Sequence, residues 1–169
     1  MNKSTIIDEV AQYIHWLSIP LPEFNNMPIC PFIERELKQD ALYIDIWYPH
    51  LNSLMSTIET FLLSDKNSAL IICQDTDDIS WEQVDRKTIQ KQINQMLRSN
   101  PTTDYLKSIV ISPWENFAIA GVETRKRAPY FMINLTPTEQ FGKAHKDLQK
   151  TKYYDNFTDE EKTKMKVNV

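Results

Sequence analysis

A cysteine followed by a proline, within residues 29–37, is the local sequence that could most directly carry chemistry. Proline is well suited to the first position of a helix, so Pro31 predicts a short helix with Cys30 at its N-cap. A helix N-terminus lowers the pKa of a nearby thiol, because its partial positive charge stabilises the thiolate. Cys30 is therefore the candidate catalytic nucleophile. His15 or His145, from elsewhere in the fold, could serve as its base.

Other interpretations of Cys30 stay open. Glu34 and Glu36 follow it closely, and their negative charge disfavours a thiolate. Free cysteine is among the most buried residue types and commonly serves as a small apolar filler, so Cys30 could be structural. A Cys-Pro pair also occurs where a thiolate binds haem iron, although no second ligand is spaced here to support a haem cofactor. Cys73 completes an apolar run and is predicted to lie in the core.

A basic triplet, residues 125–127, stands between two apolar segments of an otherwise acidic chain. The planar guanidinium of arginine suits a carboxylate or a phosphate, and loops at strand ends in α/β sheets commonly face ligand crevices. We therefore predict that Arg125 and Arg127 bind an anion. Tyr130 would be a polar wall of the same pocket, and Phe32, beside the cysteine, an apolar one. The alternative is an ordinary solvated loop.

Composition and charge argue against several classes of function. The two glycines, Gly121 and Gly142, are too far apart to form a glycine-rich phosphate loop. A formal net charge of −4 and a pI near 5.4 oppose binding to nucleic acid or to an anionic membrane surface. His15, His50 and His145 are isolated in the sequence, and no pair has the spacing of a metal site, so we predict no metal.

The start of the chain predicts a cytoplasmic protein. Asp8 and Glu9 interrupt what would be the apolar core of a secretion signal, and charges interrupt every run that could span a membrane. Thiols stay reduced inside the cell, so Cys30 and Cys73 are predicted to be free.

Hydrophobic periodicity predicts the elements of the first half of the chain. Apolar residues at helical spacing follow the capping candidates Ser4 and Thr5, and this first helix ends at Pro20. The elements predicted next are an irregular proline-rich segment (19–31), a strand with two different faces (41–48), a helix (51–62) and a fully buried strand (69–73). The last three form a β-α-β unit.

The second half begins with a helix at Ser80, because Ser80 and Gln83 have the reciprocal capping pattern. The strands predicted after it are 106–111, 129–135 and a shorter one at 116–122, and they are expected to pair antiparallel. A further helix begins at Pro137, where Thr136 and Glu139 complete the N-terminal signature. Thr158 and Glu161 repeat that capping pattern near the end of the chain.

These elements predict an α/β (or α+β) fold in the order α-β-α-β-α-β-β-α. A mixed sheet of four to five strands would carry helices on both faces, because a parallel β-α-β unit is buried on both sides. A thioredoxin-like order is the nearest named arrangement, although the Cys-x-x-Cys redox motif is missing. Residues 1–150 are predicted to form a single domain. Residues 151–169 carry few apolar side chains and are predicted to be a charged appendage.

Several short motifs together resemble those of a family of uncharacterised bacterial proteins. They are Trp16, Ile-Cys-Pro-Phe at 29–32, Phe-Ala-Ile-Ala-Gly at 117–121 and Arg-Ala-Pro-Tyr-Phe-Met-Ile at 127–133. The family has Trp, Leu-Cys-Pro-Phe, Phe-x-x-Ala-Gly and Asn-Arg-x-Pro-Tyr-Pro in the same order, so the resemblance spans about residues 10–150.

The resemblance concentrates attention on Cys30 and Arg127 but implies no particular reaction. Members of the family have a second proline where this chain has Phe131, and a histidine where it has Asn134. Any acid–base or metal role of that histidine is therefore not carried over to this chain.

Two functional hypotheses follow from these residues. In the first, a small anionic molecule binds or reacts in a pocket that joins the Cys30-Pro31-Phe32 turn to residues 125–130. In the second, the chain is a non-catalytic accessory protein that presents an aromatic surface to a protein partner or to a second copy of itself. Whether the protein is an enzyme stays open at this point.

Overall fold

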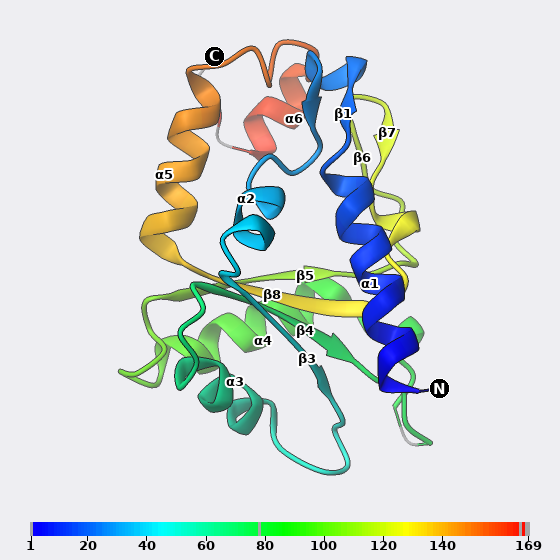
Figure 1. Cartoon of the computed structure of the whole chain (residues 1–169), viewed down its shortest axis with the longest axis vertical. Coiled ribbons are helices and arrows are strands. Elements are labelled where there is room, and N and C mark those ends of the chain that lie inside the picture. The colour runs from blue at the N-terminus through cyan, green and yellow to red at the C-terminus, as the bar shows by residue number, and fades with distance from the viewer. Residues whose placement is uncertain (1, 78, 166, 168–169) are drawn as a thin grey trace.

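The computed structural model describes residues 2–77, 79–165 and 167, without the side chains of Glu34 and Lys126. A mixed four-stranded sheet crosses the middle of the molecule in the order β3-β4-β8-β5 (Figure 1). The strands are β3 (Leu42–Trp47), β4 (Ser68–Cys73), β5 (Leu106–Ile111) and β8 (Phe131–Pro137). β3 and β4 are parallel, and β8 runs antiparallel to both of its neighbours, β4 and β5. The predicted α/β architecture with a mixed sheet is confirmed.

The first two strands form the predicted β-α-β unit through α3 (Leu54–Leu62). Every residue of β4 is buried, as its continuous apolar sequence requires of a central strand. α3 begins at Ser53, whose hydroxyl accepts the Ser56 N–H at 3.2 Å. β3 is an edge strand, so the order differs from a thioredoxin-like one, in which the first strand of this unit lies inside the sheet.

Helices cover both faces of the sheet, as predicted. One face packs on α3 and α4 (Arg86–Arg98), with Ile58 and Leu97 fully buried against Ile71 and Ile133. The other face packs on α1 (Lys3–Leu17), and α2 (Ile33–Lys38) and α5 (Thr138–Gln149) stand on this side of the sheet (Figure 1). The core therefore has two layers, one on each side of the sheet.

The start of α4 differs from the prediction. Residues Trp81–Gln83 form a single 3-10 turn, and the helix proper begins after Asp85. The Asp85 carboxylate accepts the Thr88 N–H at 3.0 Å and is the stronger cap, whereas the Ser80 side chain makes no capping hydrogen bond. The displaced turn buries Trp81, whose ring stacks on Phe131 with centroids 4.9 Å apart.

The start of α5 also differs by one residue. Pro137 is the last residue of β8 and occupies the N-cap, without a side-chain capping bond. The Thr136 hydroxyl, predicted as the cap, donates instead to the Asn134 side-chain oxygen at 3.0 Å. Strand pairing therefore extends into what the sequence marks as the helix start.

α4 lies along the outer edge of β5 and accepts hydrogen bonds from its backbone. The Asn94 side-chain oxygen accepts the Ser108 N–H and the Gln90 side-chain oxygen accepts the Val110 N–H, both at 3.0 Å. Amide side chains thus take the place of a fifth strand at this edge.

The remaining strands form two small antiparallel pairs beside the main sheet. They are β1 (Pro20–Leu21) with β2 (Met27–Pro28), and β6 (Ala118–Ile119) with β7 (Val122–Glu123). The predicted strand at 116–122 is therefore a hairpin apart from the main sheet. It turns at Ala120 and Gly121, both with positive φ.

The end of the chain differs from the expected appendage. Tyr153, Tyr154 and Phe157 are buried and pack against Phe24 and Ile29 in a third apolar cluster. Three aromatic rings supply enough apolar area to dock a segment that is otherwise rich in charge. α6 (Asp159–Lys164) follows, with the predicted capping box complete. In the part of the chain described, no helix has the length and apolar character needed to cross a membrane.

Candidate functional site

Cys30 lies in the turn between β2 and α2. Its backbone N–H donates to the Leu17 carbonyl at 3.0 Å, which ties the turn to the end of α1. The helix starts later than Pro31 predicts, with Phe32 as its N-cap, because residues 31–32 form a separate turn closed by the Ile33 N–H on the Cys30 carbonyl. Cys30 therefore precedes the N-cap by two positions.

Burial raises the pKa of the Cys30 thiol above its usual value. Hydrogen bonding from the backbone N–H groups of Ile33 and Phe32 lowers the pKa, as the sequence predicts, and the charge of Glu36 raises it again. Burial dominates, so the thiol is protonated at neutral pH. The side chain of Glu34, the other expected opponent of a thiolate, lies outside the described residues. Both cysteines are free.

We expect Cys30 to react slowly with iodoacetamide at pH 7.5, because the thiolate is the nucleophile and a raised pKa keeps it scarce. The rate should climb as the pH is raised through and beyond the ordinary thiol range. Mass spectrometry of labelled Cys73→Ser protein follows Cys30 alone, and labelling in urea gives the unprotected rate. Complete labelling within minutes at pH 7.5 would contradict the raised pKa.

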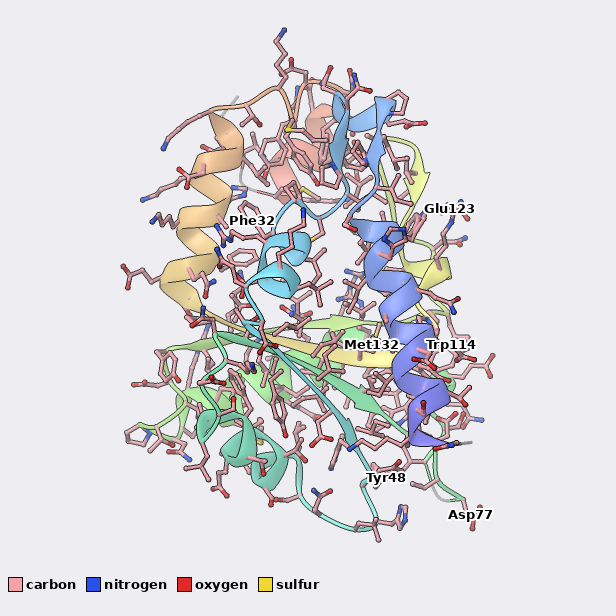
Figure 2. The ribbon with its side chains drawn as sticks, in the orientation of Figure 1. Phe32, Tyr48, Asp77, Trp114, Glu123 and Met132 are labelled. Atoms are coloured by element: carbon pink, nitrogen blue, oxygen red, sulfur yellow. The ribbon has the colours of Figure 1, made fainter. Side chains whose placement is uncertain are left out.

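A pocket of about 470 Å³ opens beside Cys30. Its walls are the turn before α2, strand β5, the inner side of α5 and the C-terminal segment. The lining residues are Ile29, Cys30, Pro31, Phe32, Lys107, Phe141, Ala144, His145, Leu148, Tyr153, Tyr154, Lys164 and Met165. Figure 2 shows Phe32 on the side of α2 that faces α5. We call this space the outer pocket.

A narrower recess of about 160 Å³ continues from the outer pocket toward the sheet. Four residues line both spaces and form the neck between them: Cys30, Phe32, Phe141 and Ala144. The other residues of this inner recess are Ile33, Arg35, Glu36, Ser68, Ile109, Asn134, Thr136 and Gln140. The neck is apolar, and most of the residues that line only the inner recess carry polar side-chain groups.

Glu36 is the buried charge of the inner recess, with only 6% of its surface exposed. Its carboxylate accepts hydrogen bonds from the Gln140 amide at 3.0 Å, the Ser68 hydroxyl at 3.3 Å and the Arg35 guanidinium at 3.3 Å. These partners come from α5, β4 and α2, so Glu36 joins three elements at the inner recess.

Basic side chains line the outer pocket. The Lys107 ammonium stands 3.7 Å from the centre of the Phe141 ring, and Lys164 pairs with Glu160 at 2.6 Å. The His145 ring has the Tyr154 hydroxyl 3.0 Å from Nδ1 and the Gln149 amide nitrogen 3.0 Å from Nε2. The contact between His145 and Tyr154 connects α5 to the C-terminal segment across one wall of the pocket.

α5 is only partly covered by the rest of the protein. All twelve of its residues are described and none is buried. Its apolar residues Phe141, Ala144 and Leu148 face the outer pocket. The stripe that the sequence assigns to helix packing is therefore a pocket wall.

The structure does not place Arg127 or Tyr130 in this pocket. The Arg127 guanidinium lies 4.5 Å from the centre of the Trp16 ring and lines a separate surface hollow with Glu9 and Tyr13. The Tyr130 hydroxyl donates to the Glu9 carboxylate. Burial and this carboxylate raise the pKa of Tyr130 to about 12.

Arg125 is engaged in an ion-pair cluster. Its guanidinium bonds to the Glu115 carboxylate at 2.9 Å and lies 4.2 Å from the centre of the Phe117 ring. Arg86 bonds to the same carboxylate oxygen at 2.6 Å. Burial and the nearby Arg86 lower the pKa of Arg125. Tyr13 lies between this cluster and the cysteine turn: burial raises its pKa to about 12, Cys30 adds to the rise and Arg125 opposes it.

The residues that sequence reasoning missed come from distant parts of the chain. Glu36 is visible only as a charge near Cys30, and Lys107 and Gln140 lie on a strand and a helix whose neighbours depend on strand order. The sequence does point to His145, which was named as a possible base and lies beside the apolar residues of α5 that line the outer pocket. Across the described ranges, no three His, Cys, Asp or Glu side chains gather where they could hold a metal ion.

Comparison of the chain with protein-family models, with curated proteins and with solved structures finds no match.

Proposed function

We propose that this protein binds a small anionic molecule in the outer pocket and inner recess beside Cys30. The observation that carries the proposal is the outer pocket itself. Its volume of about 470 Å³ falls in the range of ligand sites, roughly 300–1,000 Å³, and its lining is largely apolar with a few polar groups. The apolar residues of α5 that line the outer pocket are only partly buried and would gain apolar contacts from such a ligand.

Charge supports an anionic ligand. Among the described side chains that line the two spaces, Arg35, Lys107 and Lys164 are basic and Glu36 is acidic. Arg35 contacts Glu36, and Lys164 pairs with Glu160, so the support comes from the two lysine side chains at the outer pocket rather than from a net local charge. An anionic group there could accept hydrogen bonds from the Lys107 and Lys164 ammonium groups, in competition with Glu160 for Lys164.

Binding is favoured over covalent catalysis at this site. The raised pKa of Cys30 leaves its thiol protonated, which suits an apolar wall of the neck better than a nucleophile. Cys30→Ser is accordingly a substitution in the lining rather than the removal of a reacting group.

Filling the pocket tests the proposal. Wild-type protein should bind 8-anilinonaphthalene-1-sulfonate, an aromatic anion whose fluorescence rises in an apolar site, and octanoate should displace it. Ala144→Trp places a large ring in the neck and should weaken the binding of the dye and of octanoate by about tenfold or more. Ala11→Trp, at an exposed position of α1, is the matched control and should bind like the wild type.

Two results would overturn the proposal: no saturable binding by the wild type, or equal binding by both tryptophan variants. Either would make the accessory-protein hypothesis the better one. Circular dichroism of each variant shows whether the fold is retained.

A further inference from the structure

The two ends of the pocket differ in chemistry, and the difference restricts what can fill it. The outer pocket has Lys107 and Lys164 at its walls, the inner recess has Glu36 in its lining, and the neck between them is apolar. A ligand that spans both spaces would meet cations at one end and a buried carboxylate at the other.

The carboxylate at the inner end is incompletely neutralised. Arg35 is its one basic contact among the described side chains, through a single 3.3 Å bond, and the Arg35 side chain is 48% exposed. Water therefore screens the arginine more than it screens Glu36, which keeps only 8% of its side chain exposed. A buried carboxylate in this position favours a cationic hydrogen-bond donor.

The remaining groups of the recess are compatible with such a donor. A carboxylate has about four lone-pair sites, and Glu36 has three protein donors, two of them at 3.3 Å. The Thr136 hydroxyl donates to the Asn134 side-chain oxygen at 3.0 Å, and the lone pairs that remain on these two oxygens are further acceptors in the same recess. An ammonium has three N–H donors and no acceptor, which matches this surplus of acceptors.

We propose that the ligand of this pocket is a dipolar molecule, with an ammonium at the inner recess, an anionic group at the outer pocket and an apolar chain or ring between them. This inference rests on the proposed function and adds the second charge. Glu36 is the residue that selects the ammonium, and the neck of Cys30, Phe32, Phe141 and Ala144 holds the apolar part.

Three probes of similar length test the inference on wild-type protein: 8-aminooctanoate, octanoate and N-acetyl-8-aminooctanoate. Each is measured by displacement of 8-anilinonaphthalene-1-sulfonate. The aminooctanoate should bind about tenfold more tightly than octanoate, because its ammonium gains a hydrogen bond to the charged Glu36 carboxylate. The acetylated probe keeps the chain and loses the charge, so it should show no advantage over octanoate.

Glu36→Gln keeps the size of the side chain and removes its charge. It should abolish the advantage of 8-aminooctanoate and leave octanoate binding within about twofold of the wild type. Glu139→Gln, an exposed position on α5, is the matched control and should preserve the advantage. If Glu36→Gln fails to fold, the comparison among the three probes on wild-type protein still decides.

The outcomes separate the two proposals. Equal binding of octanoate and 8-aminooctanoate would overturn the dipolar ligand and leave the anionic-ligand function standing. An advantage that survives Glu36→Gln in folded protein would overturn the role of Glu36. Failure of every probe to displace the dye from wild-type protein would overturn the proposed function, and the dipolar ligand with it.

Discussion

Phe157→Ala is expected to lower the free energy of unfolding by about 3–4 kcal/mol, the ordinary cost of deleting a buried aromatic ring. Phe157 is 4% exposed and meets Phe24, Tyr153 and Tyr154 at ring-centroid distances of 5.6, 5.4 and 5.1 Å. Its loss would leave a cavity among rings that hold the C-terminal segment on the N-terminal half of the chain.

Urea unfolding followed by circular dichroism measures this effect. Tyr105→Ala, at a residue that is 49% exposed, removes a ring of similar size and should cost less than about 1 kcal/mol. A loss below about 1 kcal/mol for Phe157→Ala would mean that the packing of Phe157 contributes little to stability, as the predicted appendage at 151–169 would.

The second large effect is expected from Glu115→Ala, at about 2–3 kcal/mol of unfolding free energy. The Glu115 carboxylate is the shared partner of Arg86 and Arg125, whose side chains are only 12% and 13% exposed. Removing it leaves two nearby, desolvated guanidinium groups facing each other, and breaking a buried pair by deleting one partner is strongly destabilising. The figure stays below that of a fully buried pair because the Glu115 side chain is 34% exposed.

High salt provides a specific check on this prediction. Chloride screens the repulsion between the two arginines, so part of the loss in Glu115→Ala should return in 1 M NaCl. Glu82→Ala removes an exposed carboxylate and should change stability by less than about 0.5 kcal/mol. Equal stability of the Glu115 and Glu82 variants would show that the cluster contributes no net stability.

The sheet could be predicted where burial leaves a periodic pattern. Residues 69–73 are apolar without interruption because β4 is fully buried on both faces, and residues 41–48 alternate because β3 is an edge strand that is only partly buried. The start of α4 could not be predicted from the sequence. Ser80 and Asp85 both offer a capping pattern, and the burial of Trp81 decides between them. Local signals mark candidates, and tertiary packing chooses among them.

The site was predictable only in its local part. Cys30 and Phe32 are neighbours in sequence and share the pocket wall, so a turn motif was enough to find them. Lys107 reaches the outer pocket and Gln140 the inner recess because β8 lies between β4 and β5, and no local pattern encodes that strand order. For Arg127 the local sequence pointed away from its observed place. Its charge suggested an anion site, whereas its guanidinium packs on the Trp16 ring.

The amide side chains along β5 also bear on self-association. An exposed strand edge is a template on which another chain can add a strand and begin a fibril. At this edge Gln90 and Asn94 already occupy the outward N–H groups of β5, so an incoming strand must first break two hydrogen bonds and displace α4. Replacing both amides by leucine would keep the helix and free those N–H groups, and thioflavin-positive aggregation should then appear at a lower protein concentration than for the wild type.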